Sequence, residues 1–457
     1  MLRKGGMAPS RPPDSRPPRI AVVGSGISGL SCAWLLSQRH EVSVFEADAR
    51  SGGHSHTVDA PGPGGSVPVD TGFIVYNEPA YPNLTALFRH LEVPTKASDM
   101  SFAVSLDGGA LEYAGTDLRG LFAQKRNLLR PRFWAMLRDL ARFYREAPGD
   151  GAAAGLQPLG EYLASRGYSD AFRDDHLLPM AAAIWSASPG RVADYPTEAF
   201  LRFCQNHRLL QVSGRPVWRT VDGGSREYVR RLCAPFADRL HLDHGVLEIR
   251  RGADGVALRT RAGWHLERFD QVVVATHADE ALRLLPDAHD DERRLLGAFG
   301  YSRNHAVLHR DPALMPVRRS VWASWNYLAD RTGTDQPPCV TYWMNRLQGI
   351  PQDNPLFLTL NPLRPPEPRH LVRTEIYEHP LFDAAALRAQ RRLWALQGRQ
   401  RTWFCGAYFG SGFHEDGLQA GLAVAEALGQ VRRPWTVADE SGRIHLQPQA
   451  DPAAVPA

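Results

Sequence analysis

The chain has 457 residues, of which 43% are hydrophobic and 22% are charged, a length and composition typical of a globular protein with two domains. The formal net charge of +4 is too small to indicate nucleic-acid binding, and no apolar run reaches the ~18 residues that a membrane-spanning helix needs. The five cysteines are scattered without a CxxC pair, which fits a reducing compartment and argues against a structural zinc site.

The N-terminal part of the chain predicts a strand–helix–strand unit. Residues 1–18 are rich in proline and arginine and are expected to form a disordered tail. A short apolar strand then ends at Val23, and apolar residues recur at helical spacing from Ile27 onward. The stretch EVSVF returns to strand character.

The loop between the first strand and the helix has the form Gly24-x-Gly26-x-x-Gly29. This is the dinucleotide-binding fingerprint in the strand–loop–helix context that it requires. Gly24 allows a tight turn, Gly26 lets the backbone approach a pyrophosphate, and Gly29 lets the helix pack close to the strand. The helix amino terminus adds free N–H groups that favour phosphate. The loop residues expected to contact the cofactor also include Ser25, Ile27 and Ser28.

An acidic residue and a second glycine cluster follow the second strand. Glu46 lies about 20 residues after the loop, where a carboxylate accepts hydrogen bonds from ribose hydroxyls, and Ala47 adjoins it. Gly52 and Gly53 then allow a second backbone segment to approach the same pyrophosphate, and Arg50 stands just before them.

The stretch EADARSGGHSHT resembles the Arg-x-Gly-Gly segment of the flavin amine oxidase and phytoene desaturase superfamily. The resemblance implies FAD as the cofactor rather than NAD. That superfamily usually has arginine after the glycine pair, whereas this chain has His54, a weaker partner for phosphate when neutral. His54 and His56 alone are too few to hold a metal ion, so we expect no metal site.

Residues 118–145 interleave leucine and aromatic residues with eight arginines and lysines. Such a basic amphipathic segment can lie on an anionic bilayer, and Pro131 should divide it into two helices. The alternative is a pair of ordinary helices with a solvated basic face.

Two later segments complete the resemblance. It implies that the backbone near Val246 contacts the adenine and that the strand ending at Ala275 returns to the nucleotide sheet. It also implies that a helix beginning near residue 414 points its amino terminus at the flavin. In this last segment the candidate cofactor residues are Gly406, Phe413, His414, Glu415, Asp416 and Gly417.

One departure from the superfamily pattern lies in the same segment. Ala407 stands where relatives usually have an acidic residue that binds the ribityl chain. Glu415, Asp416 or a water molecule would then have to make that hydrogen bond. Alternatively, the two acidic residues only cap the helix.

The expected fold is α/β, with a Rossmann-like FAD-binding domain and an inserted α+β substrate domain, as in amine oxidases. The FAD-binding domain is predicted to be discontinuous, and two intervening segments are predicted to form the substrate domain. The ranges are 19–76, 214–285 and 396–430 for the FAD-binding domain, 77–213 and 286–395 for the substrate domain, and 431–457 for a C-terminal tail.

Longer blocks sharpen the resemblance over about residues 20–430. DTGFIVYNEPAYPNL, PMAAAIWSASP and FCGAYFGSGFHEDGLQAG are similar to the flavoprotein oxidoreductase that accompanies, and in plants is fused to, cyclopropane-fatty-acyl-phospholipid synthases. The resemblance implies oxidation or desaturation of an unsaturated or methyl-branched lipid acyl chain, with such a methyltransferase as functional partner. We expect a cytoplasmic protein that contacts the inner face of the membrane through 118–145 and binds no nucleic acid.

Two other functions remain open. The first is an amine oxidase, many of which place a lysine near the flavin; of three lysines only Lys96 stands where it could reach a site. The second is a flavin-bound partner of a lipid methyltransferase without turnover of its own. The catalytic base is not identified by the sequence. Its candidates, each equally consistent with a structural role, are Asp70, Tyr76, Tyr301, His305 and Tyr342.

Overall fold

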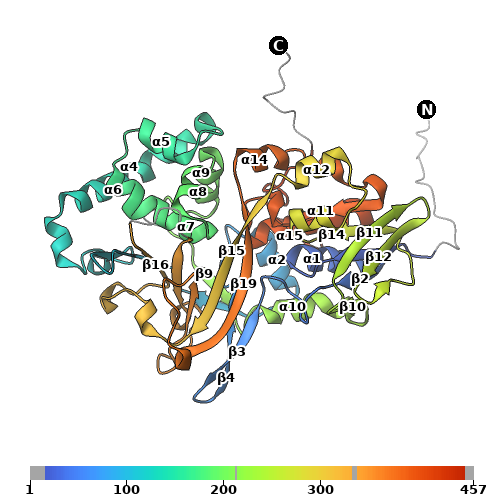
Figure 1. The fold of residues 1–457 in the computed structure, drawn as a ribbon, viewed down its shortest axis with the longest axis horizontal. Coiled ribbons are helices and arrows are strands. Elements are labelled where there is room, and N and C mark those ends of the chain that lie inside the picture. Colours follow the sequence, from blue (N-terminus) through green and yellow to red (C-terminus); the bar gives the residue numbers. More distant parts are fainter. Residues whose placement is uncertain (1–15, 212–213, 332–336, 448–457) are drawn as a thin grey trace, which may run out of the picture.

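The computed structural model describes residues 16–211, 214–331 and 337–447. Residues 1–15 of the predicted tail and the last ten residues of the chain lie outside the described residues. Two sheets organise the described part: a parallel sheet covered by helices and a larger mixed sheet beside a group of helices (Figure 1). This arrangement confirms the predicted α/β fold class with two domains of different character.

The parallel sheet carries the nucleotide-binding fingerprint. Its five strands follow the order β10-β2-β1-β14-β20, and all neighbouring pairs are parallel. The strands come from all three segments that the sequence assigns to FAD binding. They are β1 (Arg19–Val23), β2 (Glu41–Phe45), β10 (Leu240–His241), β14 (Gln271–Val274) and β20 (Thr402–Phe404).

Two helices distant in sequence pack against each other beside this sheet. They are α1 (Ile27–Leu36), which follows the glycine loop, and α15 (His414–Gly429), near the end of the chain. A Cβ on Gly421 would collide with the backbone carbonyl of Ser28, so glycine is required for this close contact. Other helices of this part are α2 (Pro82–His90), α10 (Arg226–Cys233), α11 (Ala278–Arg283), α12 (Asp290–Leu296) and α14 (Ala384–Gln390).

The larger sheet has seven strands in the order β19-β15-β18-β17-β16-β7-β8, antiparallel except where β16 meets β7. It forms one wall of the cavity described below. Its strands are β7 (Phe102–Leu106), β8 (Leu111–Ala114), β15 (Gly300–His309), β16 (Trp325–Ala329), β17 (Cys339–Trp343), β18 (Phe357–Leu360) and β19 (Leu371–Leu381), with the short helix α13 (Met344–Leu347) after β17.

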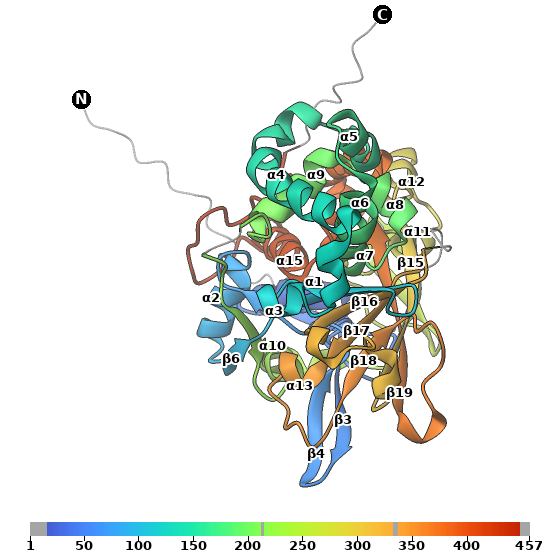
Figure 2. The ribbon, with the colours of Figure 1, turned by 90° about the vertical axis from the view of Figure 1, so that its left-hand side faces the viewer.

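Smaller strand groups surround these sheets. A hairpin of β3 (Thr57–Gly62) and β4 (Gly65–Asp70) projects from the molecule (Figures 1 and 2). The strands β5 (Tyr76–Asn77), β6 (Thr95–Ser98) and β9 (Trp218–Val221) form one three-stranded sheet, and β11 (Val246–Gly252), β12 (Gly255–Thr260) and β13 (Gly263–Trp264) form another. Short 3-10 turns occupy Ala234–Arg239, Pro312–Leu314, Arg319–Val321, Pro368–His370, Leu393–Leu396, Arg399–Arg401 and Ala407–Phe409.

A group of helices lies at the end opposite the parallel sheet (Figure 1). The basic segment 118–145 contributes α3 (Leu118–Leu121), a 3-10 turn at Lys125–Leu129 and most of α4 (Pro131–Ala154). Pro131 therefore begins a helix, where its fixed φ and missing N–H are tolerated. The remaining elements are α5 (Leu159–Ser165), α6 (Asp170–Phe172), a π turn (Arg173–Leu177), α7 (Leu178–Trp185), α8 (Pro189–Ala193) and α9 (Thr197–Asn206). Among the described residues, no helix combines the length and apolar character needed to cross a bilayer.

Asp70, a candidate base by sequence, joins three elements and does not line the cavity. Its Oδ1 accepts hydrogen bonds from the Thr57 hydroxyl at 2.6 Å and from the Ser225 backbone N–H at 2.9 Å. Its Oδ2 accepts one from the Gln348 amide at 2.9 Å. Burial raises the pKa of this carboxyl from 3.8 to about 6 in spite of these hydrogen bonds. Because the contacts of Asp70 tie elements of the fold together and its side chain does not border the cavity, they support the structural role.

We predict that Asp70 makes the stability of the fold depend on pH. Between about pH 4 and pH 6 the folded chain keeps a proton that the unfolded chain releases, so the free energy of unfolding falls as pH rises. The difference between 3.8 and about 6 corresponds to about 3 kcal/mol. The Asp70→Asn variant cannot titrate at this position. Urea unfolding at pH 4.5 and pH 7 should show wild type losing stability relative to this variant, and parallel pH profiles would contradict the prediction.

Candidate functional site

A cavity of about 1470 Å³ lies between the carboxyl ends of the parallel strands, the seven-stranded sheet and helices α4, α7 and α9. A site for one small molecule typically measures about 300–1,000 Å³. The cavity therefore has room for a dinucleotide cofactor and a second ligand. Because the glycine loop borders it, the cavity includes the place where the fingerprint would hold phosphates.

The glycine loop meets the steric requirements of the fingerprint. Gly24 has φ +100°, and a Cβ there would lie 2.9 Å from the carbonyl oxygen of Ala275. A Cβ on Gly29 would collide with the carbonyl oxygen of Gly24, so this glycine allows α1 to pack tightly. A Cβ on Gly26, in contrast, would meet no atom within 4 Å. The space in front of Gly26 is open to the cavity, which is the arrangement that a pyrophosphate needs.

The second glycine cluster lies against the first. Gly53 has φ +57°, and a Cβ there would lie 3.0 Å from the Cα of Gly26. Gly52 has φ +113°, and its backbone N–H donates to the carbonyl of Ser25 at 2.9 Å. Arg50 borders the cavity and donates to the carbonyl of Gly53 at 2.8 Å. Both segments thus line one continuous surface, with a guanidinium beside it.

Glu46 lies at the carboxyl end of β2 and borders the cavity together with Ala47. Its carboxylate accepts a hydrogen bond from the backbone N–H of Ser25 at 2.9 Å, and one from the Ser25 hydroxyl. The backbone N–H of Asp48 donates to its other oxygen at 3.0 Å. These contacts hold the carboxylate at the edge of the glycine loop, within the part of the cavity where an adenosine ribose would lie in a Rossmann-type site.

The remaining predicted contacts separate into two groups. Those that border the cavity are Ser25, Ile27, Ser28, His54, Val246, Ala275, Gly406, Phe413 and His414. Gly29, Gly52, Glu415, Asp416 and Gly417 do not border it. Gly417 packs α15 against α1, since a Cβ there would lie 2.9 Å from the Ser28 hydroxyl.

Glu415 and Asp416 do not offer side chains to a ribityl chain, contrary to the first of the two readings of the sequence. Glu415 caps helix α2, accepting from the backbone N–H groups of Asn83 and Leu84 at 3.0 Å each. Asp416 caps its own helix, accepting from the backbone N–H of Phe413 at 2.8 Å. Both carboxylates are fully buried in these roles. The role of Asp416 agrees with the capping alternative, whereas Glu415 caps a different helix, and neither residue borders the cavity.

His414 faces the cavity from the first turn of α15. Its ring stacks on Phe73 with centroids 3.8 Å apart, and its Nε2 lies 2.9 Å from the Ser55 hydroxyl and 2.8 Å from the Tyr228 hydroxyl. Burial lowers its pKa to about 3. The imidazole is therefore neutral and fixed in position at the amino terminus of the helix.

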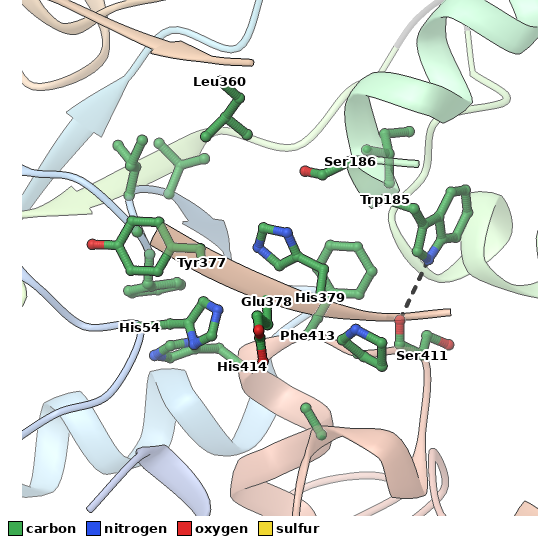
Figure 3. Close-up of a pocket in the computed structure, with 18 of the residues that line it drawn as sticks. His54, Trp185, Ser186, Leu360, Tyr377, Glu378, His379, Ser411, Phe413 and His414 are labelled. Atoms are coloured by element: carbon green, nitrogen blue, oxygen red, sulfur yellow. Dashed lines mark hydrogen bonds between the residues drawn. The ribbon is translucent and has the colours of Figure 1, made fainter. Parts of the chain in front are cut away.

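Three residues that the sequence analysis did not select lie near His54, and Figure 3 labels two of them, Tyr377 and His379. The ring of His54 is 5.1 Å from that of Tyr377, 5.3 Å from that of His379 and 6.2 Å from that of His277. Burial, followed by repulsion from the protonated forms of His379 and His277, lowers the pKa of His54 well below 6.5. Tyr377 and His379 lie two residues apart on β19, so their side chains point to the same face of the sheet. This spacing is present in the sequence, but no motif marks these two residues as part of a site.

The tautomer of His379 is determined by an amide network. The Asn304 Nδ2 donates to His379 Nδ1 at 3.1 Å, and the Asn304 Oδ1 accepts from Asn361 Nδ2 at 2.7 Å. His379 Nδ1 is therefore the acceptor, and Nε2 carries the proton. Burial, together with His277, lowers the pKa of His379 to about 4, so this ring is also neutral.

The other candidate bases differ in position. Tyr301 and Tyr342 border the cavity, and the Tyr301 hydroxyl accepts from the backbone N–H of Ala278 at 2.8 Å. Tyr76 and His305 do not border it. Lys96 does not border it either: its Nζ pairs with Asp222 at 2.9 Å. No lysine of the described residues lines the cavity.

The residues present fit FAD. The paired glycine clusters suit a pyrophosphate, Glu46 suits a ribose, and the cavity continues past His414 toward β19. When bound, FAD supplies an acceptor for a hydride. The protein contributes the close backbone approach, neutral imidazoles and the exclusion of water from buried surfaces.

Comparison with known proteins agrees with a flavin cofactor. A family model described as flavin containing amine oxidoreductase matches residues 27–309. A 44-residue segment is 48% identical to the L-amino-acid oxidase BjussuLAAO-I of Bothrops jararacussu, and this match covers 9% of each chain. The match thus spans a small fraction of the length of that curated relative.

Solved structures share the fold over nearly the whole chain. Cyclohexylamine oxidase from Brevibacterium oxydans IH-35A has a TM-score of 0.65 at 17% identity, covering 91% of this chain and 99% of that one. A putative protoporphyrinogen oxidase from Exiguobacterium sp. 255-15 gives 0.63 at 17% identity, covering 90% and 99%. The CLA-producing fatty acid isomerase from P. acnes gives 0.61 at 16% identity, covering 90% and 98%.

We predict that Gly26→Glu yields a folded protein without flavin. The new side chain has space to form but projects into the cavity with a charge that repels the pyrophosphate. Purified variant should be colourless by visible absorbance, whereas wild type should be yellow. Gly64→Glu is the matched control, because a Cβ there also meets no atom within 4 Å, on an exposed turn of the β3–β4 hairpin. Normal flavin content in Gly26→Glu would overturn the placement of the phosphates.

Proposed function

This chain belongs to the flavin containing amine oxidoreductase family and is an FAD-dependent oxidoreductase, and from that premise we propose that it oxidises a lipid acyl chain. The reaction is removal of a hydride from a carbon beside an alkene or a methyl branch, with the flavin as acceptor. The observation that carries the proposal is the apolar branch of the cavity beyond the cofactor-binding segments.

The apolar branch is formed by the substrate-side sheet and helices. Its lining includes Met100, Phe102, Leu118, Leu121, Leu137, Leu140, Met180, Ile184, Trp325, Leu358 and Leu360. These side chains offer dispersion contacts and almost no hydrogen-bonding groups, which suits a hydrocarbon chain better than a small polar substrate. The fatty acid isomerase that shares this fold acts on a fatty acid, as its name states, which supports the same substrate class.

The branch reaches the surface at helix α3. Leu118 borders the cavity and is also 74% exposed, so the cavity opens beside it. The adjoining surface carries the large exposed side chains of Leu128, Leu129 and Trp134. We therefore propose that this end of the molecule contacts a membrane and takes its substrate from it.

The basic residues divide within segment 118–145. Arg132, Arg138 and Arg142 pair with Asp175, Asp139 and Glu146, and Arg145 pairs with Glu146 as well. No carboxylate of the described residues forms an ion pair with Arg119, Lys125, Arg126 or Arg130. The proposed membrane-contacting surface is therefore residues 118–134, which include α3 and the start of α4 (Figure 2). Here cations without a carboxylate partner adjoin exposed apolar side chains, although Arg126 and Arg130 also donate to backbone carbonyls.

The resemblance to the flavoprotein that accompanies cyclopropane-fatty-acyl-phospholipid synthases supports a methyltransferase of that kind as functional partner. Such an enzyme acts, as its name states, on the fatty acyl chains of phospholipids, so the two proteins would share a substrate class. If no substrate reduces the flavin, the protein would instead act as a flavin-bound, non-catalytic partner of the methyltransferase.

Amine oxidation is the second candidate. Glu378 borders the cavity, and its carboxylate lies 3.8 Å from His277 Nδ1, so an anionic group faces the space near β19 (Figure 3). A carboxylate in that position can attract an ammonium group. The family description and the cyclohexylamine oxidase neighbour agree with this reading.

We predict that an unsaturated acyl substrate bleaches the visible absorbance of the flavin when oxygen is excluded. Leu140→Trp, which fills the apolar branch, should slow the bleaching at least about tenfold with flavin content unchanged, because added bulk excludes the chain. Leu266→Trp is the control, since Leu266 is fully exposed away from the cavity. Bleaching by cyclohexylamine but not by acyl substrates would favour the amine oxidase instead.

We also predict binding to anionic vesicles that depends on the apolar part of the 118–134 surface. Replacing Leu128, Leu129 and Trp134 by serine should weaken vesicle binding by about tenfold or more, because each apolar side chain contributes transfer free energy on burial. Flotation with phosphatidylglycerol vesicles measures the effect, and Leu266→Ser serves as control for an exposed leucine elsewhere. Equal flotation of the triple variant and wild type would remove the membrane-contact proposal.

A further inference from the structure

The fold fixes which nitrogen of His379 carries the ring proton. The backbone N–H of His305 donates to Asn361 Oδ1 at 3.0 Å, and because this group can only donate, it determines which end of the Asn361 amide is the oxygen. The Asn361 amide then donates to Asn304 Oδ1 at 2.7 Å, and the Asn304 amide donates to His379 Nδ1 at 3.1 Å. The Asn304 amide also donates to the carbonyl of Ser302 at 3.2 Å, which agrees with this orientation. The proton of the His379 ring is therefore on Nε2.

The N–H group at His379 Nε2 is a hydrogen-bond donor that faces the cavity. The ring makes its hydrogen bond through Nδ1, and no atom of the described residues accepts from Nε2. Protein atoms do not enclose Nε2, and His379 borders the cavity (Figure 3). Because the pKa of this ring is lowered to about 4 by burial and by His277, the donor is uncharged at neutral pH.

The sheet that carries His379 also forms the wall of the apolar branch. His379 on β19 lies opposite Ser302 on β15, and Ala306, on the same face of β15 as Ser302, lies opposite Leu360 on β18. Residues that lie opposite each other point to one face, and this face continues strand by strand to β7. Its members from β18 to β7 that border the cavity are Leu360, Leu358, Tyr342, Trp325 and Phe102. The donor of His379 therefore stands at one end of the surface that lines the apolar branch.

This end of the wall is the one next to the cofactor-binding segments. The ring of His379 is 5.3 Å from that of His54, which directly follows Gly53. Tyr377 is the neighbouring polar residue on the same face, and its hydroxyl already lies 2.7 Å from the hydroxyl of Thr71. The N–H of His379 is thus left to a ligand at the point where the cofactor segments meet the apolar branch.

We propose that the His379 Nε2–H group binds a carbonyl oxygen at this inner end of the cavity. The proposal rests on the proposed function, in which the cavity holds FAD and an acyl chain. Both ligands carry carbonyl groups, one kind on the flavin ring and the other on the acyl group. A neutral imidazole held in one tautomer is a donor that polarises a carbonyl group. Neither partner has to lose the hydration of a charge to form this contact.

Other ligand groups fit this donor less well. An ammonium group has no lone pair with which to accept from the N–H. A phosphate or an ionised carboxylate is favoured beside a cation, and the guanidinium of Arg50 lies instead with the glycine clusters, where it donates to the carbonyl of Gly53. A hydrocarbon segment would displace water from the N–H and leave it unpaired. A carbonyl oxygen supplies the acceptor without a charge.

The test compares His379→Phe with wild type. Phenylalanine keeps a ring and removes the N–H, and the Asn304 amide retains the carbonyl of Ser302 as an acceptor, so the variant should fold. His305→Phe on β15 is the matched control, because His305 is exposed and does not border the cavity. His379→Gln, which again offers an N–H donor, should recover most of the lost effect.

Two measurements on FAD-loaded protein distinguish the two sources of the carbonyl. If the flavin supplies it, His379→Phe should shift the visible absorbance of the flavin and lower its reduction potential, because a donor stabilises the negative charge of the reduced ring. If an acyl ligand supplies it, calorimetry should detect the contact with methyl nonyl ketone and with the alkene in which a methylene group replaces the carbonyl oxygen. The ratio of ketone affinity to alkene affinity should then fall about 3- to 10-fold in His379→Phe, the range for one neutral hydrogen bond. His305→Phe should leave both measurements unchanged.

The contrary outcomes are distinct. Flavin properties and an affinity ratio that both stay at wild-type values in His379→Phe overturn the proposal. Weaker FAD binding with unchanged absorbance and potential assigns the donor to a phosphate and overturns it too. Nitrogen NMR of wild-type protein that places the proton of His379 on Nδ1 contradicts the proposal whether or not any variant folds. If neither probe binds while flavin content is normal, acyl-chain oxidation fails, and the flavin measurement alone then decides for or against His379.

Discussion

The site depends on how closely three backbone segments approach one another at the carboxyl ends of β1 and β14. Gly24 lies against the carbonyl of Ala275, Gly29 lies against Gly24, and Gly53 lies against Gly26. A side chain at Gly24, Gly29 or Gly53 would force these segments apart, while Gly26 leaves the cavity side open. The helix α15 then packs on α1 through Gly417 and Gly421, which brings the first turn of α15 to the same cavity. One set of glycines thus positions residues that are several hundred positions apart in sequence.

This nucleotide-binding end was predictable because its chemistry is local. Strand, glycine loop, helix and acidic residue occupy one short stretch, and each glycine is required by sterics that the motif itself implies. The sequence also separated α4 from the preceding segment correctly, because Pro131 is tolerated at the start of a helix and not in its interior. That strands distant in sequence join the parallel sheet could be expected only from the resemblance. The strands β14 and β20 have no local signature beyond their apolar character.

The far end of the cavity was not predictable in the same way. Glu415 and Asp416 stand at the right place in sequence for a cofactor contact, but long-range packing decides otherwise: α2 presents its free N–H groups to Glu415, and Asp416 satisfies its own helix. His379 is an ordinary residue in sequence. Its role as an acceptor arises only because Asn304, distant in the chain, donates to one of its ring nitrogens.

The charges that border the cavity bear on how a substrate can enter it. Near β19 the imidazoles of His54 and His379 are held neutral by burial, and Glu378 is a carboxylate that borders the same cavity. The side chains of the apolar branch, in contrast, carry no charge. An apolar chain can therefore lie along the branch without separating an ion pair or leaving a buried charge unpaired, whereas a charged group placed there would lose its hydration without gaining a partner. The lining thus favours a substrate whose apolar part enters the branch and whose polar part stays outside it.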